Sequence, residues 1–421
     1  MKLLPTAITA LLLIAAATDG SPNVRTVAEG KNKNKSQPGQ QQNPMQEEQS
    51  NLVQQEQPTP VQQEQPTPVQ QEQPTPVQQE QQQSRPTSTS SGCNLTGTYK
   101  KGTDVSSCSS ITIDSLSVPA GVMLDLTKTK RGAIIEFKGT TTFGTQKWVG
   151  PLVMVSGTDL TVKGSGTLDG QGAWYWKQGQ AITRPVFFRL QNVINSKVSG
   201  FTIKNMPFRT FSLVTCRNTI LSGLTIDSRA GNGIAKNTDG FGLTKNDGVT
   251  ITGCTIYNQD DCLAMQSSVN TVFSNNYCYN THGISIGSLG GNAVDESTTV
   301  RGLTVQGNTI VNSVNALRIK TIVGLKGLVT DVKYINNEVV NVKNAIAIRS
   351  DYSKAKGGYT NNASSQVQIT GITVSGLTGT ATNLYDIKVN PKVVSDWNFN
   401  AIDVSASVKG MLLGLPNVLG I

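Results

Sequence analysis

The chain reads NTDGFGL at residues 237–243, DDCLAM at residues 260–265 and THGISI at residues 281–286. When the three segments are aligned on their first large apolar residue, an acid or a histidine stands two positions before it each time. These residues are Asp239, Asp261 and His282. A pattern that returns at coil length is typical of a solenoid.

Two later segments, NALRIK at residues 315–320 and NAIAIR at residues 344–349, continue the pattern. The five aligned apolar positions are 22, 21, 33 and 29 residues apart, which is the range of one solenoid coil. They are Phe241, Leu263, Ile284, Leu317 and Ile346. Stacked coils are separated by about 4.8 Å, so residues distant in sequence would form one column. Such a column of acids, a histidine, an arginine and a lysine is a candidate active site.

Short apolar–polar alternations with a turn glycine lie between these segments. They read VSGFTI (198–203), LSGLTI (221–226), ITGCTI (251–256), VRGLTV (300–305) and ITGITV (369–374). Each is a strand of period two, so each coil holds at least two strands. Long helical periodicity is absent from the sequence. We therefore predict an all-β, right-handed parallel β-helix. The alternative is a propeller, but its blades are antiparallel and about twice as long as this repeat.

The alternation also predicts which side chains face out. If the aligned apolar residues point inward, the residue after each one points outward. These outward residues are Gly242, Ala264, Ser285, Arg318 and Ala347. The first three are small and would form the floor of a groove, with Arg318 and Lys320 projecting at one side. A polar groove on a solenoid face suits a polymeric ligand.

The 421-residue chain has a formal net charge of +9, which suits an anionic partner. No basic run with interleaved aromatic residues is present, so we expect no nucleic-acid binding. Residues 1–20 contain Lys2 and a short apolar run from Ile8 to Ala17, a pattern of a secretory signal peptide. No later stretch is long and apolar enough to cross a membrane. We therefore expect a secreted, extracellular protein without a membrane partner, and a monomer.

Residues 21–91 are rich in Gln, Pro, Glu, Thr and Ser. The eight-residue unit VQQEQPTP starts at Val53, Val61 and Val69. A segment of this composition cannot bury a core, so we predict a disordered linker with candidate O-glycosylation sites. The predicted β-helix domain then covers residues 92–421.

The six cysteines of an exported chain favour disulfides. Cys93 and Cys108 are close in sequence at the start of the domain, and we predict that they pair. Cys262 and Cys278 fall in adjacent coils, and we predict a second disulfide there. The remaining two, Cys216 and Cys254, do not occupy equivalent positions in their coils, so their pairing stays open.

The candidate site contains three carboxylates, Asp239, Asp260 and Asp261, within about one coil spacing. Like charges this close cannot all ionise easily, so the pKa of one should rise. A protonated carboxyl beside ionised ones is what glycosidic cleavage needs. An adjacent pair of aspartates alone is more often a turn or a calcium site. The third acid in register, together with His282, the only histidine of the chain, favours catalysis.

Arg318 and Lys320 lie on the same face of one predicted strand. Arginine can bind a carboxylate through two parallel hydrogen bonds, and lysine adds a point charge. We interpret the pair as a clamp for a sugar carboxylate, in preference to a solvated strand edge.

At these residues the chain resembles the polygalacturonases, the pectin-hydrolysing enzymes of glycoside hydrolase family 28. The matching runs are NTD (237–239), QDDC (259–262), HGISIGS (282–288) with Gly290-Gly291, and RIK (318–320), with Asp351-Tyr352 and GTLDGQG (166–172) followed by Trp174 and Trp176. The resemblance covers roughly Cys93 to the C-terminus. It implies a right-handed parallel β-helix that hydrolyses α-1,4-linked galacturonan with inversion, and an endo-acting enzyme is expected.

The resemblance also implies roles for the residues of the column. Asp260 would be the general acid, while Asp239 and Asp261 would activate the water. His282 would support the acid.

Four further residues would complete the site by the same resemblance. Arg318, Lys320 and Tyr352 would bind substrate near the scissile bond, and Asn237 would help to shape the site. No cofactor and no metal are expected, and the partner is polygalacturonate or pectin.

The chain departs from the family pattern at several positions. Thr281 stands where a glycine usually precedes the histidine, and Gly242 stands where many members have a second acid. The tyrosine follows Arg349-Ser350-Asp351 in place of a Gln-Asp pair, and a C-terminal cysteine pair common in fungal members is absent.

Two other functions are compatible with a β-helix and an acidic polymer. A catalytically silent pectin-binding protein would share the groove but would show no turnover. A pectate lyase would need calcium ligands and an arginine base and would form an unsaturated product. The paired aspartates and the RIK run favour hydrolysis.

Overall fold

The structure is a computed structural model that describes residues 92–416. The predicted signal peptide and linker, residues 1–91, lie outside the described residues. The described part forms one continuous sheet system of 27 strands with a single short α-helix, α1 (Gly172–Trp176). No helix in this part is both long enough and apolar enough to span a membrane.

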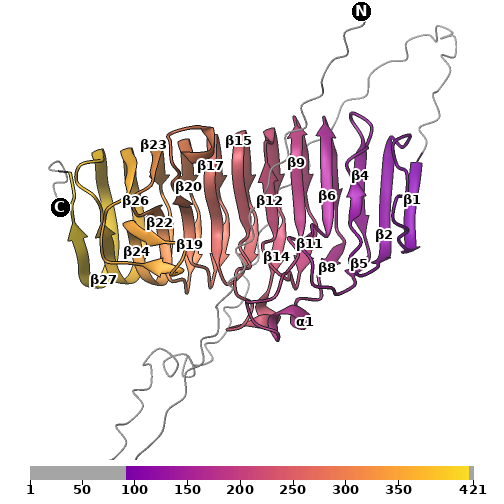
Figure 1. Cartoon of the computed structure of the whole chain (residues 1–421), viewed down its shortest axis with the longest axis horizontal. Coiled ribbons are helices and arrows are strands. Elements are labelled where there is room, and N and C mark those ends of the chain that lie inside the picture. The colour runs from indigo at the N-terminus through magenta and orange to yellow at the C-terminus, as the bar shows by residue number, and fades with distance from the viewer. Residues whose placement is uncertain (1–91, 417–421) are drawn as a thin grey trace, which may run out of the picture. The chain divides into compact units, whose positions relative to one another are not determined.

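The strands follow one another in short coils (Figure 1). The first nine are β1 (Gly92–Thr98), β2 (Ser110–Val118), β3 (Leu124–Leu126), β4 (Ile134–Lys138), β5 (Thr140–Phe143), β6 (Val153–Thr158), β7 (Thr161–Gly164), β8 (Thr167–Asp169) and β9 (Phe188–Ile194). The next nine are β10 (Lys197–Ser199), β11 (Thr202–Lys204), β12 (Phe211–Val214), β13 (Arg217–Ser222), β14 (Thr225–Asp227), β15 (Phe241–Thr252), β16 (Thr255–Tyr257), β17 (Asp261–Ser274) and β18 (Tyr277–Tyr279). The last nine are β19 (Gly283–Leu289), β20 (Thr299–Gln306), β21 (Thr309–Val311), β22 (Asn315–Ile322), β23 (Lys326–Ile335), β24 (Glu338–Ser353), β25 (Gly358–Tyr359), β26 (Gln366–Lys388) and β27 (Val394–Leu413). Two 3-10 turns, η1 (Arg229–Gly231) and η2 (Glu296–Thr298), complete the described elements.

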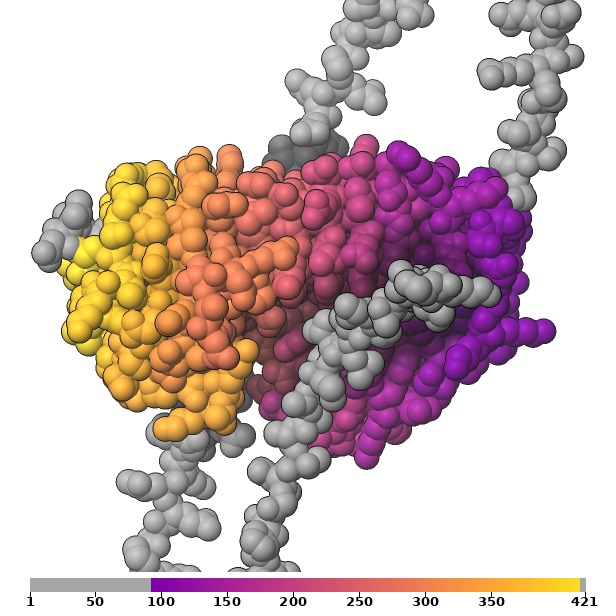
Figure 2. Space-filling model, turned by 45° about the horizontal axis from the view of Figure 1, so that its top comes forward, coloured from indigo at the N-terminus to yellow at the C-terminus, as the bar shows by residue number. Residues whose placement is uncertain are grey.

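Each strand pairs in parallel with the equivalent strand of the next coil, and the pairing of β24 with β25 is antiparallel. The predicted column is present, because Phe241, Leu263, Ile284, Leu317 and Ile346 are consecutive partners. The prediction of a right-handed parallel β-helix is confirmed. In Figure 2 the colours follow one another in bands along the described stack, as this pairing requires. The propeller alternative is wrong, because propeller blades pair their strands antiparallel.

Side chains of equivalent positions stack inside the coils. Phe188, Phe211 and Phe241 are fully buried in successive coils, and their ring centroids are 5.3 and 5.2 Å apart. Aromatic contacts of this kind add to the free energy gained by burying apolar surface. The apolar residues of each strand therefore hold the coils in register beneath the candidate site.

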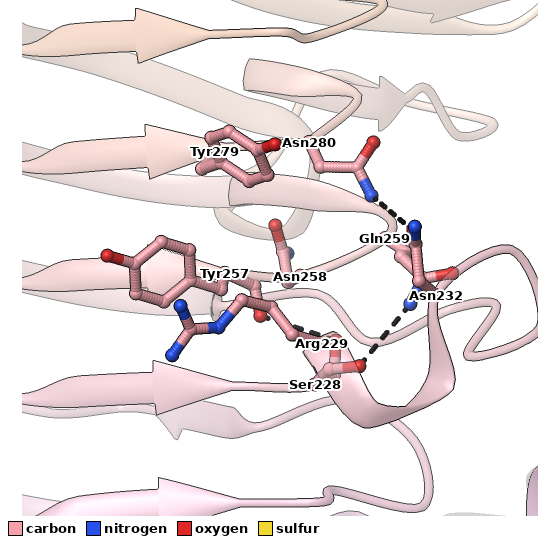
Figure 3. Close-up of a pocket in the computed structure, with 8 residues that line it drawn as sticks. All are labelled: Ser228, Arg229, Asn232, Tyr257, Asn258, Gln259, Tyr279 and Asn280. Atoms are coloured by element: carbon pink, nitrogen blue, oxygen red, sulfur yellow. Dashed lines mark hydrogen bonds between the residues drawn. The ribbon is translucent and has the colours of Figure 1, made fainter. Parts of the chain in front are cut away.

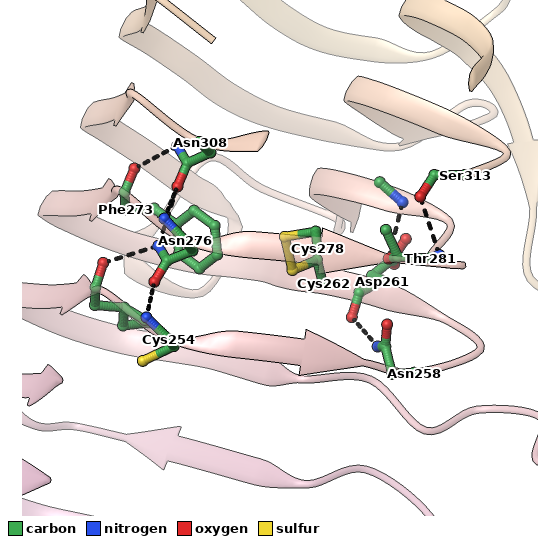
Figure 4. Close-up of a disulfide and its surroundings, with 12 residues drawn as sticks. Cys254, Asn258, Asp261, Cys262, Phe273, Asn276, Cys278, Thr281, Asn308 and Ser313 are labelled. Carbon is green, nitrogen blue, oxygen red and sulfur yellow. Dashed lines mark hydrogen bonds between the residues drawn. A yellow bond between two sulfur atoms is a disulfide. The ribbon is translucent and has the colours of Figure 1, made fainter. Parts of the chain in front are cut away.

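An asparagine ladder stabilises one corner of the helix. The Asn276 amide donates to the Asn308 side chain over 3.1 Å (Figure 4). The Asn308 amide in turn donates to Asn337 over 2.9 Å. The residue before two of these asparagines, Asn275 and Asn336, has a positive φ of 54° and 50°. Asparagine tolerates this left-handed backbone well, which explains the Asn-rich turns of the sequence.

The structure contains both disulfides that the sequence predicted, Cys93–Cys108 and Cys262–Cys278 (Figure 4). The second joins β17 to β18, and its Cys262 directly follows Asp261, the first residue of β17. The pairing of Cys216 and Cys254 was left open, and the structure has both as buried free thiols. Burial raises the pKa of each thiol to about 11, which makes them inert structural residues.

Candidate active site

The loops that lead into β15 and β17 bring three carboxylates together. Asp239 stands two residues before β15, Asp260 directly precedes β17, and Asp261 begins it. One oxygen of each lies within 4.8 Å of the others. The amide of Asn258 holds the two loops together. It donates to the carbonyl of Thr238 over 2.9 Å and to that of Asp261 over 3.0 Å (Figure 4).

His282 contacts Asp260, the acid that the family resemblance assigned to it, although the alignment had placed it in the same column position as Asp261. Asp261 is in register with Gly283, and the register shifts between Asp261 and Leu263. This shift is a β-bulge, in which β17 has one residue more than β19. Counting back from the aligned apolar residues therefore gave a register that was wrong by one residue. The His282 backbone N–H donates to the Asp260 carbonyl over 2.9 Å, and His282 Nδ1 lies 3.2 Å from Asp260 Oδ1.

Asp261 is surrounded by donors. Its Oδ1 accepts from Ser285 Oγ at 2.7 Å and from Arg318 Nη1 at 3.1 Å, and its Oδ2 accepts from Lys320 Nζ at 2.6 Å. The exposed fractions of Asp261, Arg318 and Lys320 are 2%, 9% and 7%. The two cations were expected to project from the side of a groove. Instead they fold over Asp261, because a buried carboxylate must be paired.

Asp260 is held by an amide and the imidazole. Asn237 Nδ2 donates to Asp260 Oδ2 over 3.1 Å, and the Asp261 N–H donates to Oδ1 over 2.9 Å. Burial acts to raise the pKa of Asp260, but the hydrogen bond and charge of His282 and the charge of Lys320 outweigh it and lower the pKa. Asn237 itself has a positive φ of 59°, which asparagine adopts more readily than most residues.

Asp239 is the third acid, and it differs from the other two. No described residue donates a hydrogen bond to its carboxylate, although the side chain is only 9% exposed. Burial, followed by the charges of Asp260 and Asp261, raises the pKa of Asp239 to about 7. The sequence predicted that one of the three pKa values would rise, and the structure assigns the rise to Asp239.

Sequence similarity to known proteins identifies the family of this chain. The family model described as "Glycosyl hydrolases family 28" matches residues 108–413. The chain belongs to this family. It is 40% identical over 328 residues to a polygalacturonase of Saccharomyces cerevisiae, an alignment that covers 76% of this chain and 90% of that protein.

Two solved structures of relatives share the fold. Endopolygalacturonase I from Stereum purpureum, in complex with two galacturonate, is 26% identical with a TM-score of 0.59, over 75% of this chain and 99% of that one. An endo-xylogalacturonan hydrolase from Aspergillus tubingensis is 25% identical with a TM-score of 0.68, over 79% of this chain and 98% of that one.

Arg184 supports this family 28 site, and sequence reasoning missed it. Its guanidinium donates to the carbonyls of Lys236 at 2.7 Å and Pro207 at 3.3 Å, and to Asn237 Oδ1 at 2.9 Å. Arg184 is 7% exposed, so a buried cation orients the amide that donates to Asp260. It precedes Asn237 by 53 residues, in a loop before β9, and no repeat in the sequence marks it.

Tyr359 is a second residue that sequence reasoning missed. Its hydroxyl accepts from Arg318 Nε at 3.4 Å and Nη2 at 3.2 Å. The antiparallel pairing of β24 and β25 places it beside Tyr352, with ring centroids 6.0 Å apart. Lys320 Nζ lies 5.8 Å from the centroid of the Tyr352 ring. Tyr352 therefore lies next to the cations, as expected, while Tyr359 fixes one of them.

The departures from the family pattern fit the local structure. Thr281 is fully buried, and its hydroxyl donates to the Asp260 carbonyl over 2.6 Å. It therefore holds the backbone of the acid. Gly242 lies on the cleft floor, where an added Cβ would meet only the Phe211 carbonyl oxygen at 3.4 Å.

A small cavity opens on this floor beside Asp239. It has a volume of about 50 Å³ and is lined by Arg209, Phe211, Ser212, Asp239, Gly242, Leu243, Thr244, Ala264 and Gln266.

A larger pocket lies next to the acid loop without containing an acid. It measures about 220 Å³, and the residues that line it are Ser228, Arg229, Asn232, Tyr257, Asn258, Gln259, Tyr279 and Asn280 (Figure 3). Gln259 directly precedes Asp260, and its amide donates to the Gly231 carbonyl over 2.7 Å. The pocket wall therefore helps to fix the turn that carries Asp260.

The three carboxylates are also the group of described residues whose spacing would allow them to hold a cation. Both oxygens of Asp261 already bind Arg318 and Lys320. One member of the group is therefore already paired with two cationic side chains.

Proposed function

We propose that this protein is a secreted polygalacturonase that hydrolyses the α-1,4-galacturonosyl linkages of de-esterified pectin at internal positions. The observation that carries the proposal is the cluster of three carboxylates within 4.8 Å, one with a raised pKa, beside two buried cations. Family 28 relatives named as polygalacturonases support the substrate.

Asp260 is the general acid of this proposal. The charge of Asp260 acts on Asp239, so the titration of the two carboxyl groups belongs to the pair. Since the pKa of Asp239 is about 7, the one-proton state of the pair persists up to that pH. In this state Asp260 can deliver the proton to the leaving oxygen while Asp239 is ionised. Activity should therefore fall as the pH rises through about 7, when the pair loses this proton.

Asp239 and Asp261 activate the attacking water. Asp239 suits this role because none of the described residues occupies its carboxylate. Asp261 is oriented by Ser285 and two cations. Carboxyl groups that act across a water are about 6.5–9.5 Å apart and give inversion. The 4.8 Å limit describes the closest oxygens of the cluster, so the product anomer is the measurement that decides the stereochemistry.

The positive charge of the site binds the substrate. Arg318 and Lys320 are two cations beside the acids, and such cations bind the carboxylate of a sugar next to the scissile bond. Tyr352 lies against Lys320 and offers an aromatic face. The His282 side chain is 38% exposed, so it can contact substrate as well as Asp260.

Analysis of the products formed from polygalacturonic acid tests the proposal. We expect saturated oligogalacturonides of mixed length, new reducing ends of inverted configuration in early NMR spectra, and no rise in ultraviolet absorbance. An unsaturated product would assign the protein to the lyases. Binding without any product would support the silent pectin-binding function, and retained configuration would overturn the roles of Asp239 and Asp261.

Xylogalacturonan is the second candidate substrate. The xylogalacturonan hydrolase has a higher TM-score, 0.68, than the Stereum endopolygalacturonase, 0.59. We expect the unsubstituted polymer to be the better substrate. A higher kcat/KM on xylogalacturonan would reverse this choice.

A further inference from the structure

We propose that the pocket of about 220 Å³ shown in Figure 3 is a second carbohydrate-binding site, which takes one uncharged sugar ring. Two tyrosine rings and two side-chain amide oxygens hold the sugar there. The ligand differs in charge from the galacturonate of the cleft, and its binding does not depend on the reaction proposed above.

The pocket and the cleft lie on different faces of the coil. Tyr257 ends β16 and Tyr279 ends β18, whereas the cleft floor belongs to β15, β17 and β19. The turn of residues 258–260 connects β16 to β17 and so separates the two sites. Its first two residues line the pocket, and its third, Asp260, belongs to the acid cluster. A sugar can therefore occupy the pocket while the polymer occupies the cleft.

Two tyrosines form the aromatic wall of the pocket. Tyr257 and Tyr279 are direct partners in the pairing of β16 with β18, and their ring centroids are 5.8 Å apart. The residues before them, Ile256 and Cys278, are fully buried, so the alternation of each strand turns both tyrosines outward. The face of an aromatic ring is electron-rich. It therefore suits the weakly positive C–H groups on one side of a sugar ring.

Two buried amides of the pocket wall each have an oxygen without a donor. Asn258 and Gln259 are 1% and 7% exposed. Both amide nitrogens donate to backbone carbonyls, which fixes the orientation of the two side chains. Within residues 92–416, Asn258 Oδ1 and Gln259 Oε1 accept no hydrogen bond. The Asn258 oxygen points toward the side of the pocket on which Tyr279 lies (Figure 3). A buried acceptor without a donor is costly, and a sugar hydroxyl is a donor.

The charges around the pocket favour a neutral ligand. Arg229 is the one charged side chain among the described residues that line it. Its guanidinium donates to both oxygens of Asp227, over 3.0 and 2.8 Å, and lies 3.9 Å from the centroid of the Tyr257 ring. Its charge is therefore already balanced. The two amide oxygens repel a carboxylate and accept from hydroxyl groups, so the pocket should prefer a neutral sugar to a uronate.

The size of the pocket fits a single ring. Its volume of about 220 Å³ is below the roughly 300–1,000 Å³ of pockets for drug-sized ligands. Arg229 and Asn232 at its rim are exposed, so the pocket is open to solvent. The Asn280 amide donates to Asn232 Oδ1 over 3.2 Å and connects two parts of this rim. The ligand is therefore a terminal neutral sugar, either free or at the end of a side chain of a polymer.

Binding of neutral methyl glycosides tests the site. In an Asp260→Asn background, calorimetry and saturation-transfer NMR would measure binding of methyl β-galactopyranoside and methyl β-xylopyranoside, with and without saturating trigalacturonate. We expect a neutral glycoside to bind equally well in both cases, and methyl galacturonide to bind the pocket more weakly. A xylogalacturonan fragment that binds better than the free glycoside would identify the polymer side chain as the source.

Variants of the aromatic wall locate this binding. Tyr279→Ala should weaken it about tenfold, and Tyr279→Phe should retain it, because the ring face makes the contact. Tyr277→Ala is the matched control. Tyr277 lies on the same strand with its ring 6.0 Å from that of Tyr257, but it does not line the pocket. Asn280→Ala, at the rim, replaces Tyr279→Ala if that variant fails to fold.

Two results would overturn the site, and neither depends on the bond chemistry of the cleft. The first is the absence of saturable binding of both glycosides to the folded protein, which would leave only water in the pocket. The second is displacement of the glycosides by trigalacturonate, which would place them in the cleft. Polygalacturonate hydrolysis by Tyr279→Ala with Asp260 intact should be unchanged. A loss of turnover with undiminished glycoside binding would also contradict the proposal.

Discussion

Two buried ion clusters lie in neighbouring coils and differ in charge balance. In the first, one carboxylate, Asp261, is bound by two cations, Arg318 and Lys320. In the second, one cation is bound by two carboxylates. Lys320 and Arg349 are direct partners in the pairing of β22 with β24, so the two clusters are one coil apart.

The second cluster is closed. Arg349 donates to both oxygens of Asp351, over 3.0 and 2.7 Å, and to Asp386 over 2.8 Å. Asp351 is fully buried, and it also accepts from the Asn361 N–H at 3.0 Å. The Arg349 guanidinium further lies 4.2 Å from the centroid of the Tyr359 ring. Each charged group of this cluster therefore has a hydrogen-bond partner of opposite charge within it.

The first cluster is open on one side. Asp239 lies within 4.8 Å of Asp260 and Asp261, yet none of the described residues donates to its carboxylate, and its pKa is raised to about 7. The two clusters show that burial of charged groups alone does not identify a catalytic site. Asp239 distinguishes this cluster from the closed one, because a carboxylate without a donor is available to take up a proton or hold a water.

The largest effect should come from the acid of the open cluster. Asp260→Asn keeps the shape of the side chain but removes the proton, and general acid catalysis is worth about 10²–10⁴-fold in rate. We expect a loss of kcat in that range with an unchanged melting temperature. An aryl oligogalacturonide, whose leaving group needs no proton, should lose much less. An equal loss on both substrates would remove Asp260 from the role of acid.

The closed cluster should respond in stability. Arg349→Met leaves the buried carboxylate of Asp351 and the partly exposed carboxylate of Asp386 without their cation, and breaking a buried pair typically costs about 3–5 kcal/mol. We expect the free energy of unfolding in urea to fall by this amount. Arg131→Met is the control, because the Arg131–Asp159 pair is exposed and such pairs contribute at most about 1 kcal/mol. If Arg349→Met were as stable as the control, the cluster would not stabilise the fold.

Lys320→Ala tests the cations of the open cluster. Each charge-assisted contact is worth roughly 1.5–3 kcal/mol, so we expect kcat/KM on galacturonate oligomers to fall about 10- to 150-fold. Arg318→Ala should act in the same direction. Lys333→Ala, at an exposed ion pair, is the control. Unchanged kinetics in the Lys320 variant would mean that this lysine only neutralises Asp261.

Arg184→Met tests whether a buried cation acts on Asp260 through an amide. Asn237 would lose the hydrogen bond that Arg184 donates to its side-chain oxygen, so the Asn237 amide should position Asp260 less well. Misplacement of a catalytic group by about 1 Å can lower the rate about 10²-fold. We expect kcat to fall roughly 10- to 100-fold, with a shifted pH profile. Arg184→Lys should restore part of the activity. A lower melting temperature with an unchanged pH profile would show a purely structural role.

Asp239→Asn should stabilise the protein at high pH. The raised pKa means that folding favours the protonated carboxyl, so stability falls as the pH rises from about 3.8 to about 7. Replacement by Asn removes this cost, and a rise of one in pKa corresponds to about 1.4 kcal/mol. We expect at least this gain at pH 8 and little change at pH 3, measured by urea unfolding. A gain that is equal at both pH values would contradict the raised pKa.

The sequence was sufficient to predict the fold and the meeting of the three acids, for a simple reason. In a parallel β-helix, residues at equivalent positions of successive repeats become neighbours. Aligning Phe241, Leu263 and Ile284 therefore predicted the pairing that the structure shows. It also predicted that Asp239, Asp260 and Asp261 would meet.

Contacts that break the repeat were beyond the reach of the sequence. The bulge after Asp261 shifts the register by one residue, so counting placed His282 level with Asp261, and only the family resemblance pointed to its contact with Asp260. Arg184 and Tyr359 come from loops outside the repeat. Whether Cys216 and Cys254 would pair was equally undecided.

The chemical groups that share the cleft can be predicted from the sequence, because their spacing equals the length of a coil. The distribution of charge among them depends on the folded structure. It places Arg318 and Lys320 against Asp261 and leaves Asp239 without a donor. It also leaves the side-chain oxygens of Asn258 and Gln259 without a donor among the described residues. A pKa or an unpaired acceptor depends on burial and on the positions of neighbouring atoms, and these are properties of packed side chains that no repeat pattern contains.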